Sequence, residues 1–290
     1  FGVACGEKNI FLTNNDSAYE TAISLIQKGI NVEAVIDNRE EVDSKLVYEV
    51  ERNNIKVYKG FTVVNTSGYR RINKVTIMRL SKDGQKVVGS KINLSCDCLG
   101  ISGGWTPAVH LFTQSGGKLK FREEDQIFIP NTYPSDQISV GSCNGDLSLE
   151  DILINVPKAL KEFLNIKKTE YENIEVLSSE NRSKRNIWLI PSDKVLGKTK
   201  SFVDYQNDAT AKDIKLALRE GFRSIEHVKR YTTTGMGTDQ GKLGNMHALG
   251  IISETAGTKM GEHGTTTFRP PYTPLTFGTI VGRNVGEYFD

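Results

Sequence analysis

The stretch from Lys8 to Asp37, KNIFLTNNDSAYETAISLIQKGINVEAVID, decides the fold class of this chain. Its first six residues are β-rich, and Gly29 and Asp37 follow its two later apolar segments. The first of these segments has helical spacing, at Ala18, Ala22, Leu25 and Ile26, and the second is the strand-like run 32–36. Strand, helix and strand in this order predict a βαβ unit, as at the start of an α/β dinucleotide-binding domain.

The same patterns predict further helices and strands in the residues after Asp37. The pattern predicts helices over 42–52, 108–114 and 149–164, with Pro157 kinking or splitting the last. It predicts strands over 56–58, 61–65, 74–80, 86–93, 98–102 and 137–140, with a hairpin turn at Asp83-Gly84. The fold class is therefore α/β, with a Rossmann-like domain of flavoprotein type followed by a small α-rich module.

Composition excludes several classes of function. The 290 residues suffice for two domains, and a net charge of +2 gives no global field for nucleic acid or an anionic membrane. No apolar run reaches the length of a membrane span, and no leader is visible. Four cysteines without disulfide or zinc spacing favour a reducing cytoplasm. Because residue 1 is Phe, we expect the chain to be an internal piece of a longer polypeptide.

The turn after the first predicted strand lacks the GxGxxG fingerprint of a dinucleotide site, since it reads TNNDSA. Ser17 and Glu20 fit a capping box, and Asp16 would repel a phosphate, so we interpret the turn as structural. Asp37 stands where a ribose-binding acid would lie, but without a phosphate loop we interpret it as a strand-end turn residue.

Two small-residue loops are better cofactor candidates. Ser102-Gly103-Gly104-Trp105 follows a predicted strand, and its glycines permit close backbone approach, although a plain strand-to-helix turn fits equally well. The loop 141–146 reads GSCNGD and resembles a flavoprotein ribose-binding motif, with Gly141, Asn144, Gly145 and Asp146 as its candidate residues.

Metal and catalytic signals are weak. Cys96 and Cys98 would point to the same side of one strand, but a metal needs more ligands, and we interpret both as buried structural thiols. The histidines lie in different segments, and no catalytic set stands out. We therefore predict no metal site and no catalytic residue in this chain.

A second stretch, from Asp204 to His247, reads DYQNDATAKDIKLALREGFRSIEHVKRYTTTGMGTDQGKLGNMH. It resembles the small helical domain of bacterioferritin-associated ferredoxins without its cysteines. The four cluster positions hold Asp204, Gln206, Asp239 and either Gly244 or Asn245, which cannot replace the thiolates of a cluster. The residues predict helices over 212–220 and after Ser224. We expect this module to fold without iron.

Together with TNNDSAY, SGGWTPAVHLF, QSGGKLKF and TTFRPPYTPLTFG, this module resembles the alpha subunits of heterotetrameric sarcosine oxidases. The resemblance implies oxidative demethylation of sarcosine to glycine in a flavin-binding beta subunit, with FAD as acceptor. Electrons then pass to FMN at the subunit interface and to oxygen, and tetrahydrofolate takes the one-carbon unit. It implies NAD and a shared FMN for this chain, with FAD and tetrahydrofolate elsewhere in the complex, and smaller subunits as further partners.

The turn after the second module helix is the candidate phosphate site for FMN. Cations and hydroxyls gather there, at Lys229, Arg230, Thr233, Thr234 and Lys242. A basic, solvated helix face is the alternative, and the resemblance favours the phosphate.

The resemblance divides the chain into four parts. Residues 1–166 would be part of an NAD/FAD-type domain, 167–199 a linker, 200–258 the module, and 259–290 a connector to a folate-binding domain. An alternative function is a non-catalytic scaffold in another flavin-dependent amine or amino-acid dehydrogenase complex. The sequence disfavours an independent NAD-dependent dehydrogenase and a [2Fe–2S] carrier.

Overall fold

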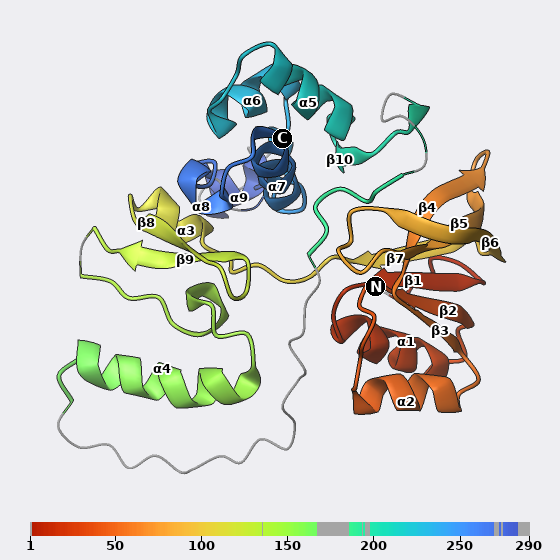
Figure 1. Ribbon diagram of the computed structural model, residues 1–290. Helices are drawn as coiled ribbons and strands as arrows, with labels where there is room; N and C mark the ends of the chain where they lie inside the picture. The colour runs from red at the N-terminus through yellow and green to blue at the C-terminus, as the bar shows by residue number, and fades with distance from the viewer. Residues whose placement is uncertain are drawn as a thin grey trace. The chain divides into compact units, whose positions relative to one another are not determined.

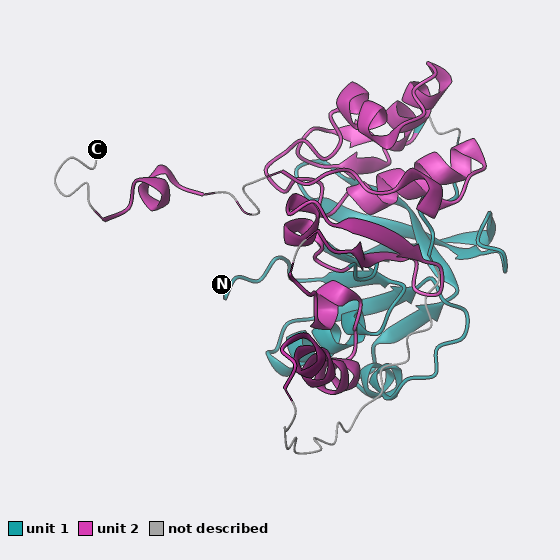
Figure 2. Cartoon of the chain, turned by 90° about the vertical axis from the view of Figure 1, so that its left-hand side faces the viewer, with its two compact units in different colours: residues 1–106, 172–198 teal, residues 107–171, 199–290 magenta. Residues whose placement is uncertain are grey.

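The computed structural model describes residues 2–134, 136–166, 186–192, 194, 198–269, 273 and 275–283. The chain divides into two units, residues 1–106 with 172–198 and residues 107–171 with 199–290 (Figure 2). Residues 107–166 thus group with the C-terminal residues, whereas the sequence suggested a boundary near 166. Most of the predicted linker over 167–199 and part of FRPPYTP lie outside the described residues.

Unit 1 is built on a parallel sheet of order β3-β2-β1-β7 (Figure 1). Its strands are β1 (Asn9–Thr13), β2 (Val32–Asp37), β3 (Lys56–Lys59) and β7 (Cys98–Ser102). Helices α1 (Ser17–Gln27) and α2 (Lys45–Arg52) follow β1 and β2. The predicted βαβ unit and the α/β fold class are confirmed.

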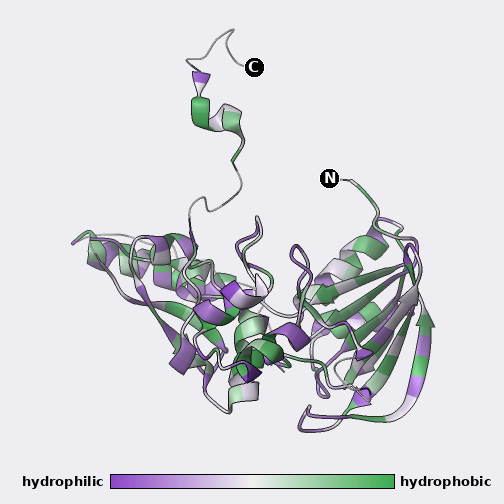
Figure 3. Cartoon of the chain, turned by 90° about the horizontal axis from the view of Figure 1, so that it is seen from above, coloured by the Kyte–Doolittle hydropathy of each residue, from purple (hydrophilic) through white to green (hydrophobic). Residues whose placement is uncertain are grey.

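A second, antiparallel sheet covers the parallel one. It consists of β4 (Phe61–Gly68), β5 (Ile72–Leu80) and β6 (Val87–Ser95), in that order. Successive residues of β1 and β2 point to opposite faces. Ile10 and Ile36 therefore pack against Val75 and Ile77 of β5, while Val35 packs with the helices. Figure 3 shows hydrophobic residues concentrated along these strands.

Cys96 and Cys98 do not share a strand, contrary to the sequence interpretation. Cys96 follows β6 and is buried in the core between the two sheets, whereas Cys98 begins β7 and is only half-buried. Asp97, at a bend between them, accepts hydrogen bonds from the backbone amides of Glu7 and Lys8. The bend separates the environments of the two thiols.

The first helix of unit 2 is α3 (His110–Gln114), as predicted from the sequence. The antiparallel strands β8 (Lys118–Arg122) and β9 (Ile127–Thr132) follow it, and the sequence did not predict them. The predicted strand 137–140 is not a strand. Val140 is extended, with φ −135° and ψ 158°, but no strand among the described residues pairs with this segment. A short 3₁₀ turn, η1 (Gly141–Asn144), and α4 (Leu149–Phe163) follow, and α4 continues through Pro157 without being split.

The module over 202–256 is a helical core with a small β-ribbon. Its elements are β10 (Phe202–Asp204), β11 (Ala209–Thr210), α5 (Ala211–Arg219), α6 (Ile225–Thr232) and α7 (Asn245–Ala256). As predicted, α5 buries Ile214, Ala217 and Leu218, and it contacts both α6 and α7. A capping box between Thr210 and Asp213 fixes the start of α5.

The short helices α8 (Met260–His263) and α9 (Phe277–Val281) lie in the segment expected to be a connector. Among the described residues, no helix has both the length and the apolar character needed to cross a membrane.

Candidate functional site

Two regions carry the residues singled out in the sequence. The first is the carboxyl edge of the parallel sheet in unit 1, formed by the loops after β1, β2 and β7. The second is the loop system of the helical module in unit 2, around Asp204 and residues 233–245. The loop Gly141–Asp146 lies in unit 2 and therefore belongs to a different unit from Ser102–Trp105.

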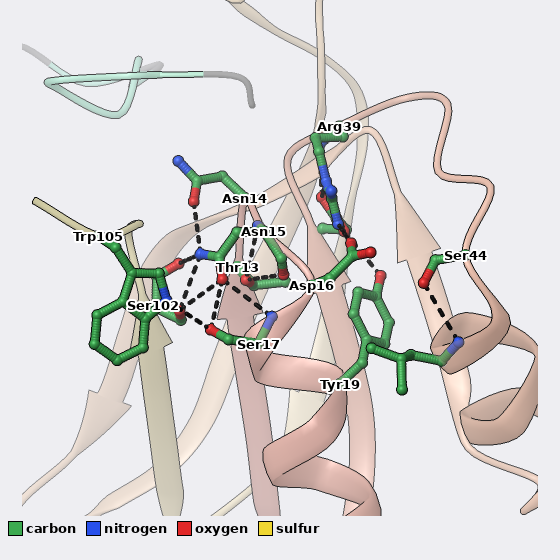
Figure 4. A network of polar contacts seen from close by, with 12 residues as sticks. Thr13, Asn14, Asn15, Asp16, Ser17, Tyr19, Arg39, Ser44, Ser102 and Trp105 are labelled. Carbon is green, nitrogen blue, oxygen red and sulfur yellow. Dashed lines mark hydrogen bonds and ion pairs between the residues drawn. The ribbon is translucent and has the colours of Figure 1, made fainter. Parts of the chain in front are cut away.

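Side-chain amides tie the loop after β1 to the loop after β7 (Figure 4). The Asn14 amide donates to the carbonyl oxygen of Gly103 at 3.1 Å, and the Asn15 amide donates to the Ser102 hydroxyl at 3.0 Å. The indole N–H of Trp105 donates to the Ser17 hydroxyl at 3.2 Å. These contacts join the two loops directly, at the position where a dinucleotide pyrophosphate would approach a Rossmann sheet.

The capping box predicted for Ser17 and Glu20 is wrong. Helix α1 begins at Ser17 with Asp16 as the preceding cap residue, and no side chain caps it. The Ser17 hydroxyl instead donates to the side-chain oxygen of Asn15 at 2.6 Å. The Ser17 hydroxyl therefore bonds to Asn15 in the loop after β1 and does not accept a hydrogen bond from an amide of α1.

A buried charge network occupies the same edge beside β2. Arg39 binds Asp37 through Nε at 3.1 Å and Nη2 at 2.8 Å, and its Nη2 also reaches Asp16 at 2.7 Å. The exposed fractions of the three side chains are 3%, 0% and 5%. The Tyr19 hydroxyl donates to Asp37 at 2.8 Å. We call Asp16, Tyr19, Asp37 and Arg39 the Arg39 network.

The protonation states within the Arg39 network follow from its geometry. Burial, and then the charge of Asp37, raises the pKa of Tyr19, so that its hydroxyl keeps its proton and donates. Burial opposes the charge on Arg39, but the hydrogen bond and charge of Asp37 prevail and raise the pKa of Arg39. Asp37 is thus an internal ion-pair partner rather than a simple turn residue, and its carboxylate is not exposed to a ribose.

The loop Gly141–Asp146 is shaped by its two glycines. Both have positive φ, +68° at Gly141 and +89° at Gly145. A Cβ on Gly145 would lie 2.7 Å from Ile129, and the Gly145 carbonyl oxygen accepts from Arg122 at 2.7 Å. The Asp146 carboxylate accepts from the Asn155 amide at 2.9 Å. Arg122 and Ile129 belong to the missed strands β8 and β9, which hold this loop in place.

In the module, the residues at the four cluster positions are hydrogen-bond partners of nearby loops. Asp204 accepts from the backbone amides of Gln206 at 2.8 Å, Asn207 at 3.0 Å and Gly235 at 2.7 Å. Burial alone would raise the pKa of Asp204, but the amides, Gly235 first, hold it below its usual value. The buried carboxylate therefore joins β10 to the turn after α6.

The other three positions act in the same way. Gln206 accepts from Thr238 at 3.2 Å, and Asp239 accepts from the amide of Gly241 at 3.1 Å. Of the two candidates for the fourth position, Gly244 has no side chain, whereas the Asn245 amide donates to the Gln240 carbonyl oxygen at 3.3 Å and to the Thr266 hydroxyl at 2.9 Å. Among the described residues, no cluster of three or more potential metal-ligating side chains is present. We call Asp204, Gln206, Asp239 and Asn245 the polar replacement set.

The candidate phosphate residues lie at the end of α6 and in the loop before α7. Lys229 and Arg230 are in the last turn of α6, and Thr233 ends the helix in the left-handed conformation with φ +60°. The Thr233 hydroxyl donates to the carbonyl of Thr232, and the buried Thr234 hydroxyl pairs with that of Thr232. The structure thus uses both threonine hydroxyls internally, while Arg230 is exposed and Lys229 and Lys242 are half-buried.

Lys242 lies beside His110 of α3. His110 is buried, and its ring centroid is 3.8 Å from that of Phe268. Burial, and then the charge of Lys242, lowers the pKa of His110 to about 4.

We expect unit 2 to lose stability as the pH falls from about 6.5 to about 4, because in this window the unfolded state binds a proton at His110 and the folded state does not. Measuring the His110 titration by NMR checks the pKa directly. A His110→Gln variant should show a shallower loss of stability over the same range, whereas His227→Gln, at an exposed position, should not. A His110 titration near 6.5 would contradict this prediction.

Known proteins share sequence similarity with this chain. Residues 198–283 match the family model described as the sarcosine oxidase A3 domain. The whole chain is similar to one part of sarcosine oxidase alpha subunits. It is 33% identical to the alpha subunit from Rhizobium meliloti (strain 1021) and 33% identical to that from Corynebacterium sp. (strain U-96). Both alignments cover 100% of this chain, but only 28% and 30% of the relatives.

The similarity to a solved structure supports the fold. L-proline dehydrogenase from P. horikoshii aligns over 98% of this chain and 51% of its own, with a TM-score of 0.54 and 20% identity. The polar replacement set lies within residues 198–283, which match the A3 domain. The Arg39 network lies before these residues in the chain. Sequence reasoning missed Asn14, Asn15 and Arg39, although the run of polar residues directly after β1 was a usable signal.

Proposed function

We propose that this chain is part of the alpha subunit of a sarcosine oxidase complex. The complex would demethylate sarcosine oxidatively to glycine, transfer the one-carbon unit to tetrahydrofolate and produce hydrogen peroxide. A flavin-binding beta subunit and smaller subunits would be its partners. The observation that carries the proposal is the alignment of the entire chain with sarcosine oxidase alpha subunits, through both the α/β unit and the A3 domain.

For NAD, two separate candidate loops are proposed, Ser102–Trp105 in unit 1 and Gly141–Asp146 in unit 2, each taken by itself. The positive φ angles of Gly104 and Gly145 and the exposed Trp105 support close approach of a ligand. The dinucleotide position at β1 and β2 does not fit NAD, because Asn14 and Asn15 close it and Arg39 occupies Asp37. A ribose hydroxyl could use Asp146, whereas the pyrophosphate needs donors from outside these loops.

FMN is proposed to lie at the interface with the beta subunit, with its phosphate near the end of α6. A doubly charged phosphate at an interface is costly to desolvate without cations and directed donors. Lys229 and Arg230 supply charge there, and Lys242 supplies it from the loop before α7. Since Thr233 and Thr234 already donate or pair internally, their hydroxyls would position the loop more than bind the phosphate.

The experiment that tests the proposed function is reconstitution with the partner subunits. The chain should copurify with a flavin-binding beta subunit of a sarcosine oxidase, and the complex should form peroxide from sarcosine. Heat-released nucleotides, identified by mass spectrometry, should include NAD and FMN. Peroxide formation by this chain alone, or a complex that oxidises other amines but not sarcosine, would contradict the proposal.

Removing two of the basic side chains should weaken flavin binding. In a Lys229→Met, Lys242→Met variant the apolar stems remain and the charges are lost, so we expect the complex to assemble with a several-fold lower FMN content. A matched variant, Lys212→Met with Lys259→Met, removes two exposed charges elsewhere on the A3 domain and should retain FMN. Full FMN occupancy in the first variant would show that the end of α6 does not bind the phosphate and is a solvated basic surface.

A scaffold role is the second candidate, and the closed sheet edge favours it. If a purified complex contains this chain but no NAD, the α/β unit serves to support the interface rather than to hold a cofactor.

A further inference from the structure

Two cysteines, Cys5 and Cys98, belong to segments that lie side by side at the amino end of the parallel sheet, opposite its carboxyl edge. Cys98 begins β7 and pairs in register with Asn9 of β1. Cys5 lies four residues before Asn9 and is exposed to solvent. The segment between Cys5 and Asn9 therefore runs toward the start of β1, directly beside Cys98.

Hydrogen bonds hold this segment against the residues around Cys98. The amides of Glu7 and Lys8 donate to the Asp97 carboxylate at 3.0 and 2.8 Å. The Asn9 side-chain amide donates to the carbonyl oxygen of Gly6 at 3.1 Å. In return, the backbone amide of Cys98 donates to the Lys8 carbonyl oxygen at 3.3 Å. The chain just after Cys5 is consequently fixed in position.

Gly6 lets the backbone pass close to Cys98. A Cβ built on Gly6 would lie 2.6 Å from the Cβ of Cys98, so a side chain at this position would collide. Neighbouring Cα atoms are about 3.8 Å apart, and a disulfide needs its two Cβ atoms roughly 4 Å apart. Cys5, the next residue back, is thus within reach of Cys98 after a small rotation of an exposed segment.

The electrostatic environment agrees with this proximity. Burial, followed by the charges of Cys5 and Asp97, raises the pKa of the Cys98 thiol. Arg71, which contacts Asp97 at 3.3 Å, opposes this shift. Cys96, by contrast, is 1% exposed and packs in the core with Ile10 and Val75, so it is not accessible to an oxidant.

We propose that Cys5 and Cys98 form a dithiol that hydrogen peroxide converts into a disulfide. The exposed Cys5 thiolate attacks one peroxide oxygen, the O–O bond breaks, and Cys5 sulfenic acid and hydroxide form. The Cys98 thiolate then attacks the sulfenic sulfur, the S–O bond breaks, and a second hydroxide leaves. With the two thiol protons, each peroxide yields one disulfide and two waters. The product ties the segment before β1 to β7.

The test uses the purified chain with hydrogen peroxide, followed by alkylation of the remaining thiols and peptide mass spectrometry. We expect a cross-linked pair of peptides containing Cys5 and Cys98, lighter by about 2 Da than the sum of the reduced peptides, since the reaction removes two hydrogens. Dithiothreitol should reverse it. Cys143→Ser, in unit 2, should leave the cross-link unchanged, and Cys98→Ser should abolish it and let a dimedone probe trap Cys5 sulfenic acid.

Two results would overturn the proposal. One is oxidation of Cys5 to sulfinic acid while Cys98 remains fully alkylated. The other is a Cys5 cross-link found only between two chains on a non-reducing gel. Neither result depends on partner subunits or sarcosine, so this inference stands or falls apart from the proposed function.

Discussion

Replacing Arg39 by methionine is expected to lower the free energy of unfolding by about 3–5 kcal/mol, the range for removing one partner of a buried ion pair. Asp16 and Asp37 would be left buried without a cation, and Asp37 would keep only the Tyr19 hydroxyl and the backbone amide of residue 39 among its described donors. Urea unfolding of the whole chain, followed by circular dichroism, measures the loss.

The matched control is Arg79→Met. Arg79 also pairs with a carboxylate, Glu40, at 2.6 Å, but the two side chains are 50% and 41% exposed. An exposed pair contributes about 0–1 kcal/mol, so this variant should unfold almost like the original. A second variant, Arg39→Met with Asp37→Asn, should regain part of the stability because it removes one uncompensated charge. Equal small losses for Arg39→Met and Arg79→Met would show that the Arg39 network is not a stabilising element.

Replacing Asp204 by alanine should have the second largest effect, about 3 kcal/mol, because hydrogen bonds to charged groups contribute about 1.5–3 kcal/mol each and are partly replaced by water when lost. The change deprives three backbone amides, those of Gln206, Asn207 and Gly235, of their acceptor. Gly235 is buried, so its amide cannot simply turn to water. Hydrogen exchange should show lost protection at Gly235 before global unfolding.

Asp204→Asn is the informative partner variant. It keeps one acceptor oxygen and removes the charge, so its loss should be smaller than that of Asp204→Ala. Glu220→Ala, an exposed acid at the end of α5, controls for the removal of a negative charge from the A3 domain and should change stability little. If Asp204→Ala unfolds like Glu220→Ala, the carboxylate does not join β10 to the turn after α6.

The fold was predictable where local patterns decide it. The apolar spacing of Lys8–Asp37 fixes which face of α1 meets the sheet, and the alternation in β1 assigns Ile10 and Leu12 to one face. The predicted strand 137–140 failed because alternation alone does not supply a neighbouring strand. The hairpin β8–β9 was missed although Lys118–Arg122 alternates, since its connection carries charged residues rather than a familiar turn sequence.

The candidate sites were less predictable because their contacts join distant positions. Asp16 and Arg39 are 23 residues apart, and Asn15 reaches Ser102 across 87 residues. The Ser17 capping box failed for the same reason, since Asn15, itself held by Ser102, competes for the Ser17 hydroxyl. In the A3 domain, the hydrogen bonds of Asp204 to Gly235 and of Gln206 to Asp239 span 31 and 33 residues. The contact of Asn245 with Thr266 spans 21 residues, so no local pattern predicts it.

The hydrogen bonds of the polar replacement set, we propose, hold the A3 domain together in place of a metal cluster. The most direct test is anaerobic reconstitution of the whole chain with iron and sulfide, followed by desalting, metal and labile-sulfide analysis and thermal unfolding. We predict no retained iron or sulfide, no iron–sulfur absorbance, and the same melting temperature before reconstitution, after it and in a chelator. Stoichiometric iron with labile sulfide, together with a raised melting temperature, would contradict this account.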